Sequence, residues 1–187
     1  MFTKVNRARR RKTKELIRDP AAFASKLARD IEKIVRAAER KIMKPTIRLN
    51  GTSDLRWERI AVEHNGERFA SIMEAFPSVQ FYDYTKRIDR SELPPNYSLT
   101  FSRSGENDSE CYSMLERGIN VAVVFAIQKK DPLPDRFMGY PVIDGDRSDT
   151  RFLDPAPAIV GLRAKGKARG KASLRRDRVG FIIRSVA

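Results

Sequence analysis

The chain has 187 residues with 38 Lys and Arg against 24 Asp and Glu, a formal net charge of +14. Its 41% apolar and 9% aromatic content predicts one folded domain with tails and excludes a collagen-like or wholly disordered chain. Because Cys111 is the single cysteine, a disulfide framework and a self-contained zinc or iron–sulfur site are excluded, and we expect a reducing compartment. The sequence contains no apolar run of about 18 residues, so no membrane-spanning helix is predicted. The basic N-terminus lacks the apolar stretch of a secretory signal.

The positive charge is concentrated at the two ends of the chain. Residues 1–48 carry a net charge of +11 and residues 163–187 a net charge of +8, whereas residues 49–162 carry −5. We therefore expect a basic N-terminal helical arm at 1–44, an α/β body at 45–163, and a basic loop or tail at 164–187 that can include a final strand. Basic runs can serve solubility alone, but two separate arms favour nucleic acid as the partner. The residues expected to contact nucleic acid are Arg7, Arg9, Arg10, Arg11, Lys12, Lys165, Lys167, Arg169, Lys171, Arg175 and Arg176.

Taken in chain order, the first predicted element is an amphipathic helix from Asp19 to about Met43. Asp19 is a typical N-cap, and Pro20 suits the first helical turn. Apolar residues recur at three- and four-residue steps and form one stripe. The stripe consists of Phe23, Leu27, Ile31, Ile34, Val35 and Ala38, and the opposite face carries Lys26, Arg29, Lys33, Arg36 and Arg40.

Six short β-rich segments follow, at 46–50, 79–84, 97–102, 120–125, 140–144 and 158–162. Their starts lie 18 to 33 residues apart, which leaves room for crossover connections and favours parallel βα units. Helices are expected around 69–76 and 111–115, the second ending at Gly118. No Asn-Gly or Asp-Gly pair joins two of these segments at hairpin spacing, which disfavours an antiparallel sandwich. The expected fold is α/β with parallel βα units, an incomplete (βα) barrel or an open sheet, preceded by the N-terminal amphipathic helix.

Polar side chains recur where five of the six predicted strands end, the place where parallel α/β folds collect functional groups. Lys86 beside Asp83 can form a catalytic pair or a surface ion pair. Arg103 with Ser102 can hold a phosphate, and Trp57 and Tyr84 can stack on a base, although Trp57 suits a lid or the core equally well. The catalytic candidates are Asp54, Asp83, Lys86 and Asp144, and the substrate-binding candidates are Asn50, Trp57, Tyr84, Ser102, Arg103 and Arg163. If the chain is an enzyme, Asp54, Asp83, Lys86, Arg103 and Asp144 should converge in one concave site.

Metal and nucleotide motifs are sparse. Asp144 and Asp146 offer carboxylates that suit Mg²⁺, although a plain Asp-Gly turn is the commoner explanation of this sequence. The single histidine, His64, excludes paired-His nickases, His-based triads and zinc hydrolases. There is no phosphate-binding Gly-x-x-x-x-Gly-Lys-Ser/Thr loop and no dinucleotide glycine fingerprint. Cys111 falls on an apolar helical stripe, which predicts a buried thiol.

Long sequence blocks, in the same order, resemble a phage- and prophage-encoded protein family of unknown function. The blocks are residues 47–54, 77–86, 99–104, 120–125, 139–146 and 159–166, and the resemblance extends from about Val5 to the end. It implies a bacterial host cytoplasm and longer members that carry a cysteine-rich segment upstream of the Asn6–Arg9 region, which looks like a metal or iron–sulfur site. That segment is absent here, so we expect either a shortened variant or a start assigned at an internal methionine.

Two classes of function follow. The first is a phage- or mobile-element-type protein that associates with nucleic acid, not membrane, through its basic arms. The alternative is a barrel-like enzyme, metal-dependent or not, acting on a small anionic or phosphorylated substrate, or a truncated, inactive form of one.

Overall fold

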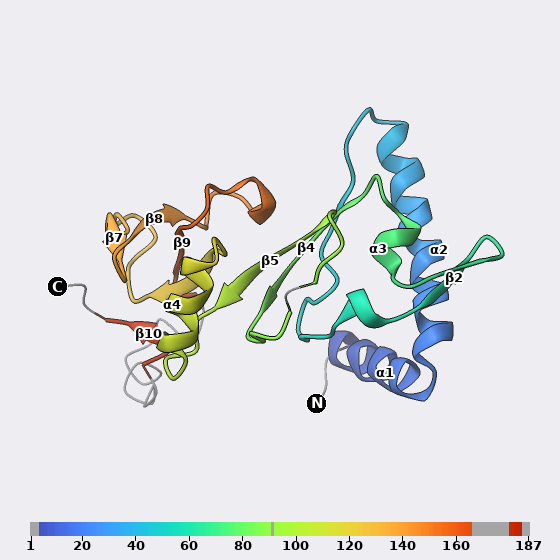
Figure 1. The fold of residues 1–187 in the computed structure, drawn as a ribbon, viewed down its shortest axis with the longest axis horizontal. Coiled ribbons are helices and arrows are strands. Elements are labelled where there is room, and N and C mark those ends of the chain that lie inside the picture. Colours follow the sequence, from blue (N-terminus) through green and yellow to red (C-terminus); the bar gives the residue numbers. More distant parts are fainter. Residues whose placement is uncertain (1–3, 91, 166–179, 185–187) are drawn as a thin grey trace. The chain divides into compact units, whose positions relative to one another are not determined.

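The computed structural model describes residues 4–90, 92–165 and 180–184 (Figure 1). The helices are α1 (Lys4–Arg18), α2 (Pro20–Glu39), α3 (Ile72–Ala75) and α4 (Asp108–Glu116), with the 3-10 helices η1 (Trp57–Arg59) and η2 (Arg151–Leu153). The strands are β1 (Thr46–Ile47), β2 (Val62–His64), β3 (Glu67–Phe69), β4 (Gln80–Thr85), β5 (Tyr97–Ser102), β6 (Val121–Phe125), β7 (Arg136–Phe137), β8 (Tyr140–Asp144), β9 (Ile159–Arg163) and β10 (Ile182–Ile183). Within these residues, no helix is long and apolar enough to cross a bilayer.

The main sheet is mostly parallel, with the strand order β1-β4-β5-β6-β9-β8-β7. The pairs β1–β4, β5–β6, β6–β9 and β8–β9 are parallel, and β10 also pairs in parallel with β6. A hydrogen bond from Phe81 N to Asn96 O joins the starts of β4 and β5, so these strands run the same way. Only β7, at an edge, is antiparallel in the described part of this sheet. The predicted α/β class and N-terminal helix are confirmed, and the described strands form an open sheet without a closed barrel.

The described residues fall into two compact units. The first is drawn from Met1–Leu49, Leu55–Phe81 and Glu92–Tyr97, and the second from Asn50–Asp54, Tyr82–Ser91 and Ser98–Ala187. Strands β4 and β5 contribute residues to both units, whereas β6, β8 and β9 belong wholly to the second.

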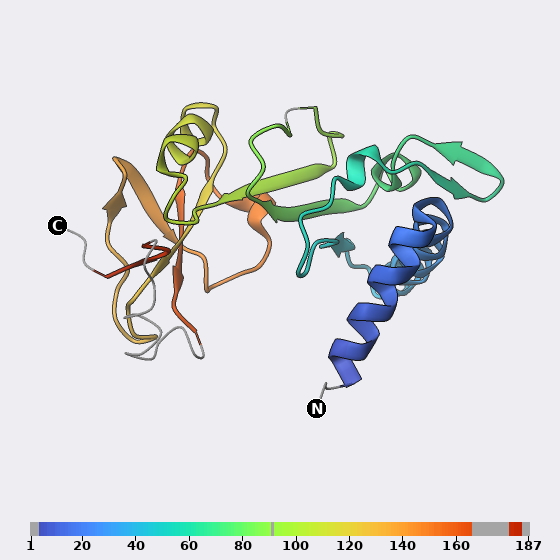
Figure 2. The same ribbon diagram turned by 90° about the horizontal axis from the view of Figure 1, so that it is seen from below.

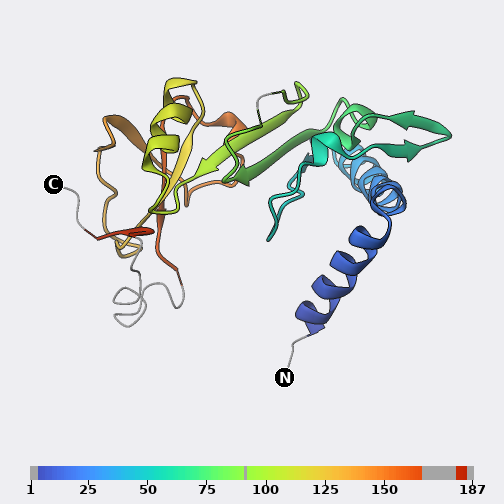
Figure 3. The same ribbon diagram turned by 60° about the horizontal axis from the view of Figure 1, so that its bottom comes forward.

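Helix α2 in the first unit begins as its sequence predicts. The Asp19 carboxylate accepts a hydrogen bond of 2.9 Å from Ala22 N, and Pro20 occupies the first turn. The helix axis bends sharply between α1 and α2 at this cap (Figure 3). Ala24, Ala28 and Ile31 form the buried centre of the helix, which packs against β2. Ile34, expected on the apolar stripe, is exposed, because the small alanines allow the closest approach on a face rotated away from it.

A β-hairpin in the first unit corrects the sequence reading. Strands β2 and β3 are antiparallel and joined by Asn65 and Gly66, whose φ angles of 51° and 82° suit a type I′ turn. Phe69 therefore lies on β3, and the helix expected around 69–76 is only the four residues of α3. Four of the six residues in the two arms are polar, so no hydrophobic alternation indicated these strands.

The core of the second unit lies among β5, β6, β9 and α4. Phe101 and Phe125 are fully buried, and Cys111 and Leu115 of α4 belong to the same buried cluster. Helix α4 lies on one side of these strands (Figure 2). Gly118, with a φ of 77°, follows the end of α4, as predicted. Burial, aided by the nearby Asp108 carboxylate, raises the pKa of the Cys111 thiol to about 11, so this group packs as a protonated, apolar side chain.

Candidate functional site

A pocket of about 510 Å³ lies at the carboxyl ends of neighbouring strands in the second unit. β8 ends at Asp144 and β9 ends at Arg163, and these two strands are parallel neighbours; Lys129 follows β6, the next strand in the sheet. We call this the strand-end pocket. Its lining residues are Lys129, Asp144, Asp146, Arg147, Arg163, Ala164 and Lys165.

Arg163 is the most firmly held side chain of the strand-end pocket. Its Nη1 donates to Asp144 Oδ1 at 2.9 Å and to Asp146 Oδ2 at 3.3 Å. Its Nε and Nη2 donate to the carbonyl oxygen of Asp131 at 3.3 and 3.1 Å. The hydrogen bond to Asp144 is the main cause of the raised pKa of the Arg163 guanidinium, which is 11% exposed. The structure therefore brings together Asp144, Asp146 and Arg163, which the sequence placed at the ends of two separate strands.

Lys165 completes the charge pairing on the second carboxylate. Its Nζ lies 2.8 Å from Asp146 Oδ1, yet the lysine side chain is 78% exposed. The hydrogen bond and charge of Asp146 raise the pKa of Lys165, with smaller contributions from Asp149 and Tyr84. Tyr84, a predicted base-stacking residue near the end of β4, is half-buried and is not among the lining residues of the strand-end pocket.

Burial alone would raise the pKa of both pocket carboxyls, but their cationic partners reverse that effect. Hydrogen bonds from Arg163 and from Asp146 N hold the pKa of Asp144 below its ordinary value. Those from Lys165 and the Arg163 backbone do the same for Asp146. Both groups are thus ionised at neutral pH and bonded to cations. Among the described residues, no group of three His, Cys, Asp or Glu side chains is arranged to hold a metal ion, so the magnesium assignment stays a prediction.

These lowered pKa values predict an acid-sensitive contribution to stability. A carboxyl with a depressed folded-state pKa stabilises the fold above the unfolded pKa of about 3.9 and loses that contribution as pH falls through the folded pKa. At pH 7, the free energy of unfolding of the Asp144→Asn/Asp146→Asn variant should be about 1–2 kcal/mol lower than that of the wild type. The difference should shrink towards zero in urea titrations between pH 4 and pH 2. An exposed control, Asp149→Asn, should show no such trend, and a pH-independent difference for the double variant would contradict an ionic origin.

A second polar cluster lies at the end of β4. Asp83 is fully buried and accepts hydrogen bonds from Asn50 N at 2.7 Å and Asn50 Nδ2 at 3.3 Å. Asp54 accepts from Thr85 Oγ1 at 3.0 Å and from Lys86 N at 2.8 Å. These contacts fasten the segment after β1 to the end of β4. Of the predicted site residues, Asn50 is thus joined to Asp83, and Asp54 is joined to the backbone of Lys86. Asp83 is buried, whereas the Lys86 side chain is exposed.

Arg103 is committed to contacts within the chain. Its Nε and Nη2 donate to the two Asp108 carboxylate oxygens at 2.7 and 3.2 Å, and its Nη1 donates to Gly180 O at 2.7 Å. The buried guanidinium ties the end of β5 to α4 and to the residues before β10. Neighbouring Ser102 accepts a hydrogen bond on its carbonyl oxygen from Asn107 Nδ2. A phosphate-binding role for this pair stays a prediction.

The remaining predicted residues lie elsewhere. Trp57 is buried in the first unit and stacked on Phe23 with 6.3 Å between ring centroids, so it lies in the core. The polar contacts of Asp54, Asp83, Lys86, Arg103 and Asp144 form three separate groups. The cations Lys167, Arg169, Lys171, Arg175 and Arg176 lie outside the described residues.

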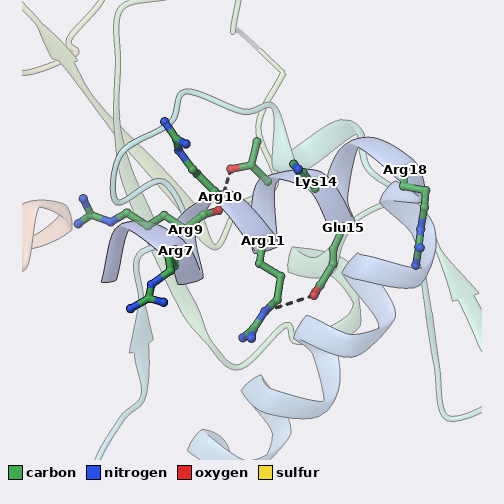
Figure 4. A pocket seen from close by; sticks show the side chains of 8 residues that line it. Arg7, Arg9, Arg10, Arg11, Lys14, Glu15 and Arg18 are labelled. Carbon is green, nitrogen blue, oxygen red and sulfur yellow. Dashed lines mark hydrogen bonds and ion pairs between the residues drawn. The ribbon is translucent and has the colours of Figure 1, made fainter. Parts of the chain in front are cut away.

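Helix α1 carries the other predicted cations. Arg7, Arg9, Arg10 and Arg11 project from it in several directions, and with Thr13, Lys14, Glu15 and Arg18 they line an open hollow of about 1070 Å³ (Figure 4). No residue of α1 is buried. Arg11 pairs with Glu15 at 3.6 Å, whereas Arg7, Arg9 and Lys12 make no ion pair with any residue that the structure describes.

Two lining residues of the strand-end pocket escaped the sequence reading. β6 ends at Phe125 with no polar side chain, and Lys129 lies four residues beyond that end, outside the strand-end pattern. Arg147 directly follows Asp146, but a search for metal ligands selects the carboxylates and not the neighbouring arginine. A useful signal would have been the basic residues within a few positions of all strand ends.

Comparison with known proteins assigns the chain to a protein family. No curated protein and no solved structure gives a significant match. The family model described as Gene product 88 matches residues 1–184, and the chain therefore belongs to this phage-type family of uncharacterised function.

Proposed function

We propose that this phage-type protein associates with nucleic acid through α1. The observation that carries the proposal is the charge and exposure of this helix. Its 15 residues include eight Lys and Arg and a single acid, Glu15, and none of them is buried. A cationic rod about 22 Å long can follow several phosphates and is narrow enough for a major groove.

Helix α2 differs from α1 in that most of its positive charge is balanced by acidic residues of the same helix. Between Pro20 and Glu39 it has four cations and three acids. Lys33 pairs with Asp30 at 3.1 Å, and Arg36 pairs with Glu32 at 2.7 Å. The charge of α1 has no comparable balance within the helix, so an external polyanion is the partner that suits it. The net charge of +8 over residues 163–187 offers a second cationic segment for the same ligand.

The test compares two triple variants of the full chain in fluorescence anisotropy with labelled duplex and single-stranded DNA and RNA. Arg7→Gln/Arg9→Gln/Arg11→Gln removes three charges from α1 and keeps good helix formers. We expect an affinity loss of about tenfold or more at about 100 mM salt, and a slope of log K against log salt that is smaller by about 2 to 3.

The matched control is Arg29→Gln/Lys33→Gln/Arg40→Gln, which removes the same charge from exposed positions at α2. It should change affinity by much less. Equal losses in both variants would show that net charge, not α1, holds the ligand. Absence of binding by the wild type at about 50 mM salt would overturn the proposal, because electrostatic binding is strongest there.

A further inference from the structure

The strand-end pocket occupies a place where open parallel sheets bind ligands. It lies at the carboxyl ends of β8 and β9 and beside the segment after β6. After β6, the next parallel strand is β8, two places along the sheet, whereas the next described strand after β9 is β10, which pairs on the opposite side of β6. Ligands of open α/β sheets bind outside the carboxyl ends of the strands, which is where this pocket lies.

The charges of the pocket leave cations available. Its lining has four cationic side chains and two carboxylates. Both carboxylates already accept hydrogen bonds from Arg163 or Lys165. Lys129 and Arg147 are exposed and make no ion pair with any residue in the described ranges. The pocket therefore combines a fixed guanidinium with exposed cationic side chains, a chemistry that suits phosphate oxygens.

We propose that the strand-end pocket binds a phosphate monoester of nucleotide size. Lys129, Arg147 and Lys165 meet the phosphate, and Arg163 stays fixed by Asp131, Asp144 and Asp146. The exposed Lys165 can exchange one carboxylate contact for the ligand at little cost, since exposed ion pairs are weak. A volume of about 510 Å³ lies in the usual range of small-molecule sites and accommodates more than a phosphate alone. This inference does not rest on DNA or RNA binding by α1.

In the first experiment, adenosine 5′-monophosphate and inorganic phosphate are titrated separately into the full chain, and binding is measured by isothermal titration calorimetry. Lys129→Ser/Arg147→Ser should weaken nucleotide binding by about tenfold or more, since each charge-assisted hydrogen bond contributes strongly. Lys130→Ser/Arg117→Ser removes the same charge from exposed positions that do not line the pocket and should leave binding unchanged. Equal effects of the two variants would overturn the proposal.

A second experiment identifies the source of the phosphate. Oligonucleotides of one sequence, with a 5′-phosphate or a 5′-hydroxyl, are compared in the same binding assay. If the pocket takes a strand terminus, the wild type prefers the phosphorylated strand and the Lys129→Ser/Arg147→Ser variant loses that preference. Equal binding of the two strands together with saturable nucleotide binding assigns a free nucleotide. Absence of both signals overturns the pocket proposal, whereas the α1 variant reports separately on nucleic-acid binding.

Discussion

Asp154→Ala is expected to lower the free energy of unfolding by about 3–5 kcal/mol, because it leaves the Arg151 guanidinium buried without its counter-ion. Arg151 Nη1 lies 3.2 Å from Asp154 Oδ2, and the two side chains are only 3% and 16% exposed. Arg151 also donates to the carbonyl oxygen of Ser148. Urea denaturation at pH 7 measures the loss.

The exposed pair of Lys33 and Asp30 is a matched control. It has the same i,i+3 spacing and a similar separation of 3.1 Å, but its side chains are 77% and 61% exposed. Asp30→Ala should therefore cost no more than about 0.5 kcal/mol. If Asp154→Ala costs no more than this control, solvent reaches Arg151 and the argument from burial fails.

The buried pair of Arg151 and Asp154 is not expected to stabilise the fold relative to two apolar side chains in its place. Burial raises the pKa of Asp154, and the charge of Arg151 reverses this only in part. A raised carboxyl pKa means that ionised Asp154 opposes folding, an opposition that fades as pH falls below the folded pKa. Arg151→Met/Asp154→Leu should consequently be as stable as the wild type or more so. A double variant as unstable as Asp154→Ala would instead point to a need for the polar contacts themselves.

The same arginine supports the strand-end pocket. A Cβ atom added to Gly145 would lie 3.0 Å from Arg151 Nη1 and 2.6 Å from a methyl group of Val160. Gly145 therefore lets the turn between Asp144 and Asp146 pack directly on its neighbours. The energetics of the buried pair and the geometry of the two pocket carboxylates are linked through this turn.

The elements that the sequence predicted well are those with strong local signals. The segments 97–102 and 140–144 coincide with β5 and β8, because aromatic and β-branched residues dominate both. The start of α2 has a side-chain cap and a proline in its first turn. The hairpin β2–β3 was missed because its short arms are polar. The turn between β7 and β8 uses Met138 and Gly139, with φ angles of 53° and 81°, and Met at such a position has no clear sequence signature.

The predicted site residues do not all lie in one site, because side chains alternate between the two faces of a strand. Successive side chains of a strand point to opposite faces, so Asp83 and Tyr84 cannot enter the same pocket. Asp83 is fully buried and bonds to Asn50, whereas Tyr84 is only half-buried. Strand ends alone indicate which edge of a sheet carries polar groups. They do not indicate the face, nor which arginines, such as Arg103, are already bonded within the chain.

Asp83→Ala should produce the second large loss of stability, about 3 kcal/mol. The substitution removes the acceptor of the buried Asn50 N–H, and a buried donor without a partner retains its full desolvation cost. Asp83→Asn keeps a carbonyl oxygen for that N–H and should lose roughly half as much. Thermal and urea unfolding of the full chain measure both variants, with Asp135→Ala as an exposed control that should change stability by less than about 0.5 kcal/mol.

These variants also separate two roles for Asp83. As a positioning residue, Asp83 holds the Asn50–Asp54 segment against β4, and the stability loss should appear without any ligand. Amide hydrogen exchange should then become faster at Asn50 in Asp83→Ala, because its N–H has lost the 2.7 Å hydrogen bond. Unchanged exchange and unchanged stability would mean that the buried carboxylate is not needed for the fold. Its burial would then have to be explained by chemistry at the end of β4.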